Sequence, residues 1–386
     1  MQDILITAKS TIASVGHNAD QIWDNYSSSE SAITMCCFND QDTPVGKLKP
    51  DSEKLIKDLR SENLSYRRLD KSVILALYTS RKVIEDSGWS SMNGVGVNIG
   101  SSRGATELFE KYHQYFLDKP ENRMSPLVSP TTTLGNIASW VAYDLGLGGA
   151  TLSHSITCST ALHSILNACA WINGGMADRF LAGGSEAPLT DFTVAQMRAL
   201  GIYSKKNTPW YCAPLEKGKD MNTMVLGEGA SMFTLEADQG QNSIARIKGL
   251  GFATEIIEHN ASLSAEAACM QKSMRMALEN SGLDNVDVVV MHAPGTCQGD
   301  QSELKAVESV LGNDVHLIST KLQTGHTLGA SGGLSLDLAI EMLNRGEVVN
   351  FPYETSVNKG TLKPQTAMIN AVGFGGNSVS IVIQKV

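Results

Sequence analysis

Short apolar runs typical of β-strands alternate with longer segments of helical periodicity along the chain. The runs lie at residues 3–7, 95–100, 152–157, 179–184, 286–291, 315–320 and 378–384, and the helical segments at residues 71–87, 137–145, 161–172, 265–281 and 331–343. Strands that alternate with helices of this length predict an α/β protein whose strands are largely parallel.

Two stretches look like copies of one unit. In the first, the strand at 152–157 leads to Cys158, a helix, a Gly-Gly pair at 174–175 and the strand at 179–184. In the second, the strand at 315–321 leads to Gly325 and His326, a Gly/Ala-rich helix and an apolar run at 348–351 that we expect to be a strand. The repetition predicts two pseudo-equivalent halves, residues 1–240 and 241–386, within one body. The alternative is a chance likeness between two common strand–helix units.

Charge and cysteine content limit the classes of protein. The net charge of −9 and the pI of about 5.4 argue against a nucleic-acid binder, which needs a basic surface. The seven cysteines include no C-x-x-C pair, which favours a reducing cytoplasm over a disulfide framework. We expect neither a signal peptide nor a membrane span, because no basic start precedes a long apolar stretch and no run of about 18 apolar residues occurs.

Cys158 is the first candidate catalytic residue. It stands between an apolar strand and a helix, so the positive end of the helix dipole is expected to stabilise a thiolate. Its neighbours Thr157 and Ser159 are small and leave the sulfur accessible, whereas Cys169 falls within the helix and is expected to be a buried packing residue. The alternative for Cys158 is the same structural role.

Two histidines, His292 and His326, each follow a predicted strand, where the ligand crevice of an open α/β sheet lies. A cysteine nucleophile with histidines indicates acyl transfer. The loop at 373–376 places three glycines around Phe374, so its N–H groups could face a carbonyl oxygen, although a plain hairpin turn is the alternative. The sequence shows no His, Cys or Asp residues at the spacing of metal ligands, so we expect no metal site. It also has neither a G-x-G-x-x-G loop before a helix nor a Walker lysine, so we expect no nucleotide site.

Six motifs in order resemble those of the β-ketoacyl-acyl-carrier-protein synthases, which belong to the condensing-enzyme (thiolase-like) superfamily. They are ITCSTAL (156–162), ADRFLAGGSEA (177–187), LGEGAS (226–231), HAPGTCQGDQSE (292–303), STKLQTGHTLGASGG (319–333) and GFGGNS (373–378). The resemblance extends over nearly the whole chain. It implies a duplicated five-layer α-β-α-β-α sandwich of thiolase-like fold, usually assembled as a homodimer.

The resemblance also implies roles for individual residues. Cys158 would be the acylated nucleophile of a Cys-His-His triad completed by His292 and His326. The remaining positions carried over are the family lysine, the acidic pair and the gate beside the nucleophile: Lys321, Asp300, Glu303 and Phe374. The implied reaction is a decarboxylative condensation of malonyl-carrier with the acyl group on Cys158, and it needs no metal or organic cofactor. Acyl carrier protein is the implied partner.

A carrier protein is acidic, so docking on this acidic chain would require a local basic patch. The candidate clusters are Arg67, Arg68 and Lys71, and separately Lys205 and Lys206. The alternative is that both clusters are ordinary solvated surface.

The sequence departs from the family pattern at three places. Residues 203–225 lack the Arg-Pro-Phe-Asp and Arg-Asp-Gly-Phe motifs. The motif that begins at His292 is His-Ala-Pro-Gly-Thr, where His-Gly-Thr-Gly-Thr is common in the family. Ser335 stands where a glutamate is frequent. These changes favour a specialised synthase for a polyketide, polyene or pigment chain. One alternative is a partner or chain-length-determining subunit of a heterodimer, although such subunits usually lose the cysteine. A degradative thiolase is disfavoured, since Cys297 has no counterpart in the loop at 373–376.

Overall fold

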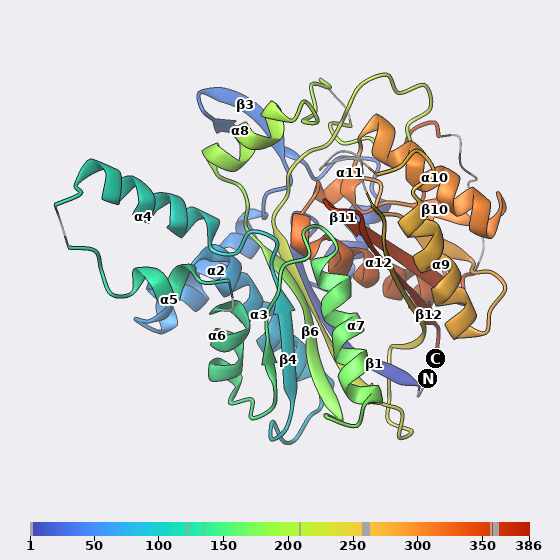
Figure 1. Cartoon of the computed structure of the whole chain (residues 1–386), viewed down its shortest axis with the longest axis horizontal. Coiled ribbons are helices and arrows are strands. Elements are labelled where there is room, and N and C mark those ends of the chain that lie inside the picture. Colours follow the sequence, from blue (N-terminus) through green and yellow to red (C-terminus); the bar gives the residue numbers. More distant parts are fainter. Residues whose placement is uncertain are drawn as a thin grey trace.

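Ten strands form one continuous sheet in the computed structural model, which describes residues 3–121, 123–134, 136–207, 210–256, 263–355, 357 and 363–386. In sheet order they are β10 (His316–Ile318), β9 (Val288–Val290), β11 (Thr366–Gly373), β12 (Asn377–Gln384), β8 (Ala245–Thr254), β1 (Ile4–Ala13), β7 (Gly229–Ala237), β6 (Arg179–Glu186), β4 (Gly96–Gly100) and β5 (Thr151–Leu152). The sheet is drawn through the centre of Figure 1.

The same strand pattern occurs twice in this sheet. The order β5-β4-β6-β7-β1 of the first half is matched by β10-β9-β11-β12-β8 in the second. In each half the first three strands pair in parallel and the last two pairings are antiparallel. The two patterns meet where Ile4–Ile6 of β1 pair antiparallel with β8. The sheet is therefore mixed. The expectation of largely parallel strands holds for the outer pairings of each half and is wrong for the inner ones.

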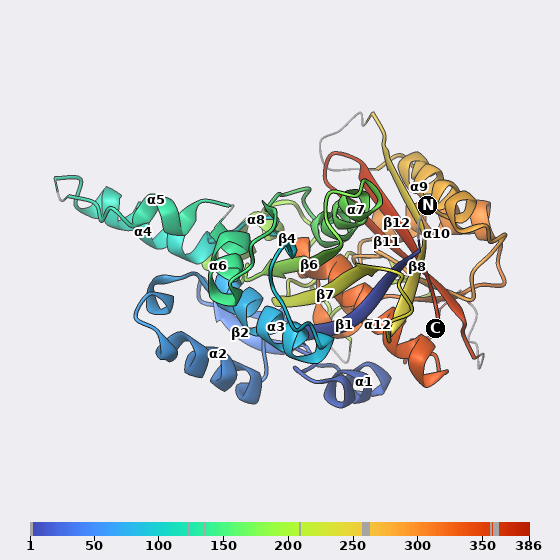
Figure 2. The same cartoon turned by 90° about the horizontal axis from the view of Figure 1, so that it is seen from below.

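Helices cover this sheet in layers, as Figures 1 and 2 show. Between the two halves lie α7 (Thr160–Asn173) and α12 (Ser331–Arg345), and α12 is buried from Ser331 to Leu343. Outside the first half lie α3 (Lys71–Ser87) and α6 (Asn136–Leu145), and outside the second lie α9 (Ala268–Ser281) and α10 (Cys297–Leu311). This is the α-β-α-β-α order that the resemblance implies, and the predicted fold class is confirmed.

Glycines allow the two central helices to pack closely. A Cβ on Gly332 of α12 would lie 2.6 Å from Leu162 Cγ of α7, and one on Gly333 would lie 2.9 Å from Ser231 Cβ of β7. Both distances are shorter than a Cβ can tolerate, so the Gly/Ala-rich start of α12 is a packing requirement. It brings the segment before α12, which carries His326, against the helix that follows Cys158.

The remaining elements lie around this body: α1 (Ala19–Ser27), β2 (Thr34–Phe38), β3 (Gln41–Val45), α2 (Pro50–Glu62), η1 (Tyr66–Arg68), α4 (Thr106–Asp118), α5 (Val128–Thr132), α8 (Asp191–Ala199), α11 (Lys321–Thr324) and η2 (Leu328–Ala330). Strands β2 and β3 form a hairpin beside α8, whereas α4 and α5 project from the body as an arm (Figures 1 and 2). Across the ranges described, none of the helices combines the length and the apolar character needed to cross a membrane.

Two predicted strands differ in the structure. The segment predicted at 152–157 is a strand only at Thr151–Leu152, because hydroxyl groups then take over the backbone: the Ile156 N–H donates to Thr160 Oγ1 at 2.9 Å. The run predicted at 348–351 is not a strand, and the Val349 carbonyl accepts a hydrogen bond from His316 Nε2 at 2.8 Å instead. In both cases a side chain replaces the expected strand partner.

Candidate active site

Cys158 occupies a tight turn just before α7. The preceding Thr157 has a φ of +47°, a left-handed conformation that is costly for a β-branched residue. The Thr160 hydroxyl donates to the Thr157 carbonyl at 2.6 Å, and the Ser159 N–H donates to the Ile156 carbonyl at 3.2 Å. These bonds hold the strained turn and place the sulfur at the mouth of the helix, where the sequence predicts it.

The protonation of this sulfur differs from the prediction. Cys158 is only 6% exposed, and burial raises the pKa of its thiol to about 12, with Glu186 adding to the rise and Lys321 opposing it. Burial therefore opposes the expected thiolate in the resting protein, because the charged form loses its hydration. Cys158 rests as a neutral thiol and must lose its proton during reaction.

His292 and His326 face each other across the site, with ring centroids 5.2 Å apart and ring planes at 81°. Burial, and then the charge of Lys321, lower the pKa of both imidazoles well below 6.5, so both are neutral at pH 7. The Nδ1 atom of each ring is buried without a hydrogen-bond partner in the described part of the chain. This favours the proton on Nε2, which gives each ring one N–H donor for a substrate oxygen.

Two buried side chains of opposite charge, Glu303 and Lys321, hold the backbone of His292. Glu303 accepts the His292 N–H at 2.8 Å and the Ala293 N–H at 2.6 Å, while Lys321 Nζ donates to the His292 carbonyl. Burial raises the pKa of Glu303 to about 7 and lowers the pKa of Lys321 to about 8. Glu303, predicted as a supporting residue, and Lys321, predicted as a catalytic one, thus both contact the backbone of His292.

The loop after His292 is anchored by Asp300 at the start of α10. Its carboxylate accepts the N–H groups of Gly295 at 2.9 Å and Leu215 at 3.0 Å, and Lys219 Nζ donates to it at 2.5 Å. Lys219 belongs to the altered 203–225 segment, and sequence reasoning missed it. The departure from the family pattern pointed to residues 203–225 as unusual. It could not show that Lys219 pairs with Asp300, because the two residues are far apart in sequence.

His326 is fixed by the segment that precedes β7. Its N–H donates to the Val225 carbonyl at 2.6 Å, and its carbonyl accepts the Gly227 N–H at 3.1 Å. Gly325 has a φ of +63°, and a Cβ there would lie 2.9 Å from the Leu226 carbonyl oxygen. Only a glycine lets the two backbones approach this closely.

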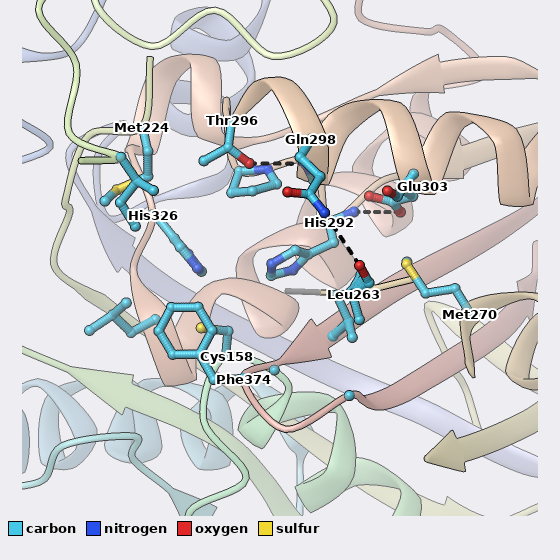
Figure 3. Close-up of a pocket in the computed structure, with 18 of the residues that line it drawn as sticks. Cys158, Met224, Leu263, Met270, His292, Thr296, Gln298, Glu303, His326 and Phe374 are labelled. Atoms are coloured by element: carbon cyan, nitrogen blue, oxygen red, sulfur yellow. Dashed lines mark hydrogen bonds between the residues drawn. The ribbon is translucent and has the colours of Figure 1, made fainter. Parts of the chain in front are cut away.

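These side chains open into one cavity of about 210 Å³. Figure 3 shows Cys158, His292, His326 and Phe374 around it, with Phe374 at the tip of the β11–β12 turn. The apolar wall of the cavity beside the thiol consists of Met197, Ile202, Met224 and Leu328. The polar wall near the start of α10 consists of Asn222, Thr296 and Gln298. The sequence-predicted nucleophile, histidines and gate therefore share a single space.

The β11–β12 turn is pressed against the cysteine turn. The Thr157 hydroxyl donates to the Phe374 carbonyl at 3.4 Å, and a Cβ on Gly373 would lie 1.8 Å from Thr157 Oγ1. Phe374 itself is 43% exposed. The loop is thus a close neighbour of Cys158 and a wall of the cavity as well as a hairpin turn.

The structure separates the five predicted carrier-binding residues into two groups. Arg67, Arg68 and Lys205 are exposed. Lys71 is largely buried and paired with Glu228 at 2.8 Å and with Glu53, and Lys206 is paired with Glu216. The charges of Lys71 and Lys206 are therefore already used inside this chain, which corrects their assignment to an exposed patch.

Two other sequence observations have a structural outcome. Cys297 Sγ lies 4.0 Å from the Lys219 carbonyl oxygen and does not line the cavity, so it is not placed as a second catalytic cysteine. Ser335 is buried, with its hydroxyl 3.3 Å from that of Thr320. Within the described ranges, no group of three or more His, Cys, Asp or Glu side chains is placed to hold a metal ion.

Comparison with known proteins identifies the family. The model described as "Beta-ketoacyl synthase, N-terminal domain" matches residues 1–240, and the one described as "Beta-ketoacyl synthase, C-terminal domain" matches residues 244–352. The 3-oxoacyl-[acyl-carrier-protein] synthase 2 of Staphylococcus aureus (strain COL) is 27% identical over 420 residues, covering 99% of this chain and 98% of the relative. The synthase of the same name from Vibrio cholerae serotype O1 is 26% identical, covering 99% of each chain.

Solved structures agree on the fold. A beta-ketoacyl synthase from Burkholderia phymatum STM815 superposes with a TM-score of 0.83 at 23% identity, covering 100% of both chains. A type II polyketide ketosynthase bound to its acyl-carrier protein gives 0.87 at 21% identity and 100% coverage of both chains, and the ishigamide ketosynthase/chain length factor gives 0.88 at 17%, covering 100% of this chain and 99% of that one. The chain belongs to the beta-ketoacyl synthase family, and it is a condensing enzyme of the acyltransferase type.

Proposed function

We propose that this chain forms a carbon–carbon bond between malonyl-acyl-carrier protein and an acyl group carried on Cys158, with release of CO₂. The observation that carries the proposal is the shared cavity, in which a buried thiol and two neutral imidazoles face the same space. The thiol supplies a covalent acyl site, and the imidazoles supply hydrogen-bond donors.

The first step transfers the acyl group to the enzyme. Cys158 Sγ attacks the thioester carbonyl of the acyl-carrier, the carbon–sulfur bond to the carrier breaks, and the carrier thiol leaves with the proton. Negative charge forms on the carbonyl oxygen, and the backbone N–H groups of Cys158 and Phe374 are the proposed donors to it. One thioester is exchanged for another, so the step needs no external energy source.

The second step generates the carbon nucleophile. Malonyl-carrier enters the same cavity and loses CO₂, and the electron pair of the broken carbon–carbon bond moves into an enolate. The negative charge of the enolate falls on the thioester oxygen, where the N–H groups of His292 and His326 stabilise it. Each such donor is worth about 2.7–4 kcal/mol in a site without water.

The third step joins the chains. The enolate carbon attacks the acyl carbonyl on Cys158, a carbon–carbon bond forms, and the carbon–sulfur bond to the enzyme breaks. Because burial raises the pKa of the Cys158 thiol to about 12, the departing sulfur regains a proton readily and the enzyme returns to its neutral resting state. The product leaves on the second carrier.

An acyl carrier protein is the proposed partner. The Staphylococcus relative is named for this carrier, and one similar ketosynthase was solved in complex with its acyl-carrier protein. The exposed Arg67, Arg68 and Lys205 are the remaining candidate contacts for its acidic surface. A specialised chain rather than a housekeeping fatty acid, and a cytoplasmic location, stay predictions from the sequence.

A second subunit is also proposed. Strand β5 ends the sheet, and the arm formed by α4 and α5, which contacts α6 beside β5, exposes Phe109, Phe116 and Leu117. A free sheet edge and an exposed apolar arm both suit a protein contact. The partner is a second copy of this chain or a related subunit, as in the solved ketosynthase/chain length factor pairs.

A labelling experiment tests the proposal. Radiolabelled acyl-carrier is incubated with the wild-type protein and with Cys158→Ala, and CO₂ release from malonyl-carrier is then followed. We expect label on the wild-type protein only, and acyl-dependent release of CO₂. Absence of label on the wild-type protein would support the alternative, a partner or chain-length-determining subunit.

A further inference from the structure

Glu186 is a buried carboxylate beside the site that the proposed reaction does not use. It is the last residue of β6, its exposed fraction is 0%, and it accepts four hydrogen bonds. Oε1 accepts from Ser101 Oγ at 2.8 Å and from the Arg103 N–H at 3.1 Å, while Oε2 accepts from the Ser102 N–H at 2.7 Å and the Gly329 N–H at 2.9 Å.

These four donors come from opposite halves of the chain. Residues 101–103 follow β4 of the first half, whereas Gly329 lies in η2, three residues after His326. A Cβ on Gly329 would lie 2.5 Å from the Ser102 nitrogen and 2.7 Å from Glu186 Oε2, so the two loops are in direct contact at the carboxylate. Glu186 thus joins the loop after β4 to the turn that follows the second histidine.

The turn that Glu186 holds is strained. Leu328, between His326 and Gly329, has a φ of +42° and lines the cavity next to Cys158. A left-handed backbone at a non-glycine residue persists only where the surroundings fix it. The hydrogen bond from the Gly329 N–H to Glu186 is one such restraint, and it acts on the residue adjacent to the strained one.

The bonding pattern requires an anion. Three of the four donors are backbone N–H groups, and the fourth, the Ser101 hydroxyl, already accepts the Gly104 N–H at 2.9 Å. A protonated acid or an amide would direct a donor of its own at these donors and lose at least one contact. The anion therefore satisfies these four donors better than either neutral form.

We infer that Glu186 is a positioning residue, which as an anion holds the turn after His326 and so sets the place of that imidazole relative to Cys158. The inference rests on the proposed function, since it concerns the step in which His326 acts. Glu186 does not line the cavity and is not assigned a contact with substrate.

The charge state of Glu186 changes in the working range of pH. Burial raises the pKa of its carboxyl to about 7, against the opposing effect of the four donors. Three titratable side chains lie on the segments that pack against Glu186: Arg103, Cys158 and His326. The Arg103 guanidinium donates to Gln196, and Cys158 and His326 are neutral at rest. The anion is present above about pH 7 and is lost as the pH falls below it, so decarboxylation should decline on the acid side.

Glu186→Gln tests the inference with two measurements on the full-length protein. Iodoacetamide alkylation reports on the Cys158 thiol, and labelled CO₂ release from malonyl-acyl-carrier protein reports on the step that uses His326. We expect alkylation no slower than in the wild type, because loss of the Glu186 charge lowers the pKa of the Cys158 thiol. We expect a kcat for decarboxylation at least about tenfold lower with an unchanged KM. The part of the acid decline that Glu186 causes should disappear in the variant, and only the part caused by Glu303, whose pKa is also about 7, should remain.

Glu236→Gln is the matched control. Glu236 is a partly buried carboxylate of β7 that accepts hydrogen bonds from Thr7 Oγ1 and Trp89 Nε1, and it lies outside the cavity. This variant should keep the wild-type kcat and the wild-type pH profile. A loss equal to that of Glu186→Gln would mean that removal of any buried carboxylate has the effect, and it would overturn the inference.

Ser101→Ala provides a second test that keeps the carboxylate. It removes one donor that stabilises the anion, so the acid decline should move to higher pH while kcat well above pH 8 is retained. The inference is overturned if Glu186→Gln leaves the rate and its pH profile unchanged, or if Ser101→Ala does not move the decline. A wild-type protein that releases no CO₂ from malonyl-carrier would instead refute the proposed function itself.

Discussion

Lys219→Met removes the cation of a buried ion pair and keeps an apolar side chain of similar length. Lys219 Nζ lies 2.5 Å from Asp300 Oδ2, and the side chains are 6% and 2% exposed. The variant leaves the Asp300 carboxylate with backbone N–H donors from Gly295 and Leu215 but no counter-charge. Breaking a buried pair by removing one partner costs about 3–5 kcal/mol of folding free energy.

The assay for this loss is the thermal midpoint. An unfolding entropy of about 2.1 cal/mol/K per residue gives about 0.8 kcal/mol/K for the 386 residues, so we expect Tm to fall by about 4–6 °C. Decarboxylation should fall as well, because Asp300 holds the loop after His292.

The pH dependence of the loss has a defined sign. Burial already raises the pKa of Asp300, and Lys219 opposes that rise, so Lys219→Met raises it further. An acid whose pKa is higher in the folded state than in the unfolded state destabilises the fold increasingly as the pH rises above its unfolded value. The fall in Tm should therefore be larger at pH 8 than at pH 5.

A double variant provides the control. Lys219→Met with Asp300→Asn carries no buried charge at this place. It should recover part of the lost Tm, because the amide nitrogen still loses one of the two backbone N–H contacts, and it should show no pH dependence of the difference. A single variant as stable as wild type at pH 8 would refute the reasoning, as would a loss that is equal at both pH values.

Three further predictions concern other parts of the site. Gly373→Ala places a Cβ 1.8 Å from Thr157 Oγ1, so the rate of Cys158 acylation should fall by about tenfold or more. Gly175→Ala, whose Cβ meets no atom within 4 Å, should leave the acylation rate unchanged. Equal acylation rates for both variants would contradict the packing argument. The pKa of Lys321 is about 8, so its positive charge beside the enolate is lost as the pH rises through that value. The rate of condensation should therefore decline on the alkaline side. A condensation rate that is flat from pH 7 to 9 would exclude a role for the Lys321 charge. Reversing both exposed charges, with Arg67→Glu and Arg68→Glu, should raise KM for the carrier and leave small thioester analogues unaffected, and no change in either would discard the patch.

The positions of the reacting groups could be predicted from local sequence. Cys158, His292 and His326 each follow an apolar run and precede a helix or turn, and the doubled strand pattern brings these ends to one place. Such signals depend on residues within about one element of the side chain, so periodicity captures them. Cys158, His292 and His326 could be singled out for this reason, whereas the five-layer fold was implied by the resemblance to the β-ketoacyl-acyl-carrier-protein synthases.

The partners of charged residues could not be predicted in the same way. The sequence predicts Lys71 to be exposed beside Arg67 and Arg68, yet its side chain pairs with Glu228. In the same way, Lys219 pairs with Asp300. Each pairing joins residues separated by about eighty or more positions, and it depends on which loops the fold brings together. A periodic pattern contains no such information, because it describes one element at a time.

The protonation of Cys158 shows the same limit in a more consequential form. The place of Cys158 at the start of a helix is a local property that the sequence shows. Desolvation depends on every residue that closes the cavity, and here it favours the neutral thiol. The result suits the proposed chemistry. With a neutral thiol and two neutral imidazoles, the free N–H donors face no anionic sulfur at rest, so their stabilisation is directed at the enolate, which carries charge only during reaction. A resting thiolate would already occupy that stabilisation and would compete with the enolate for it.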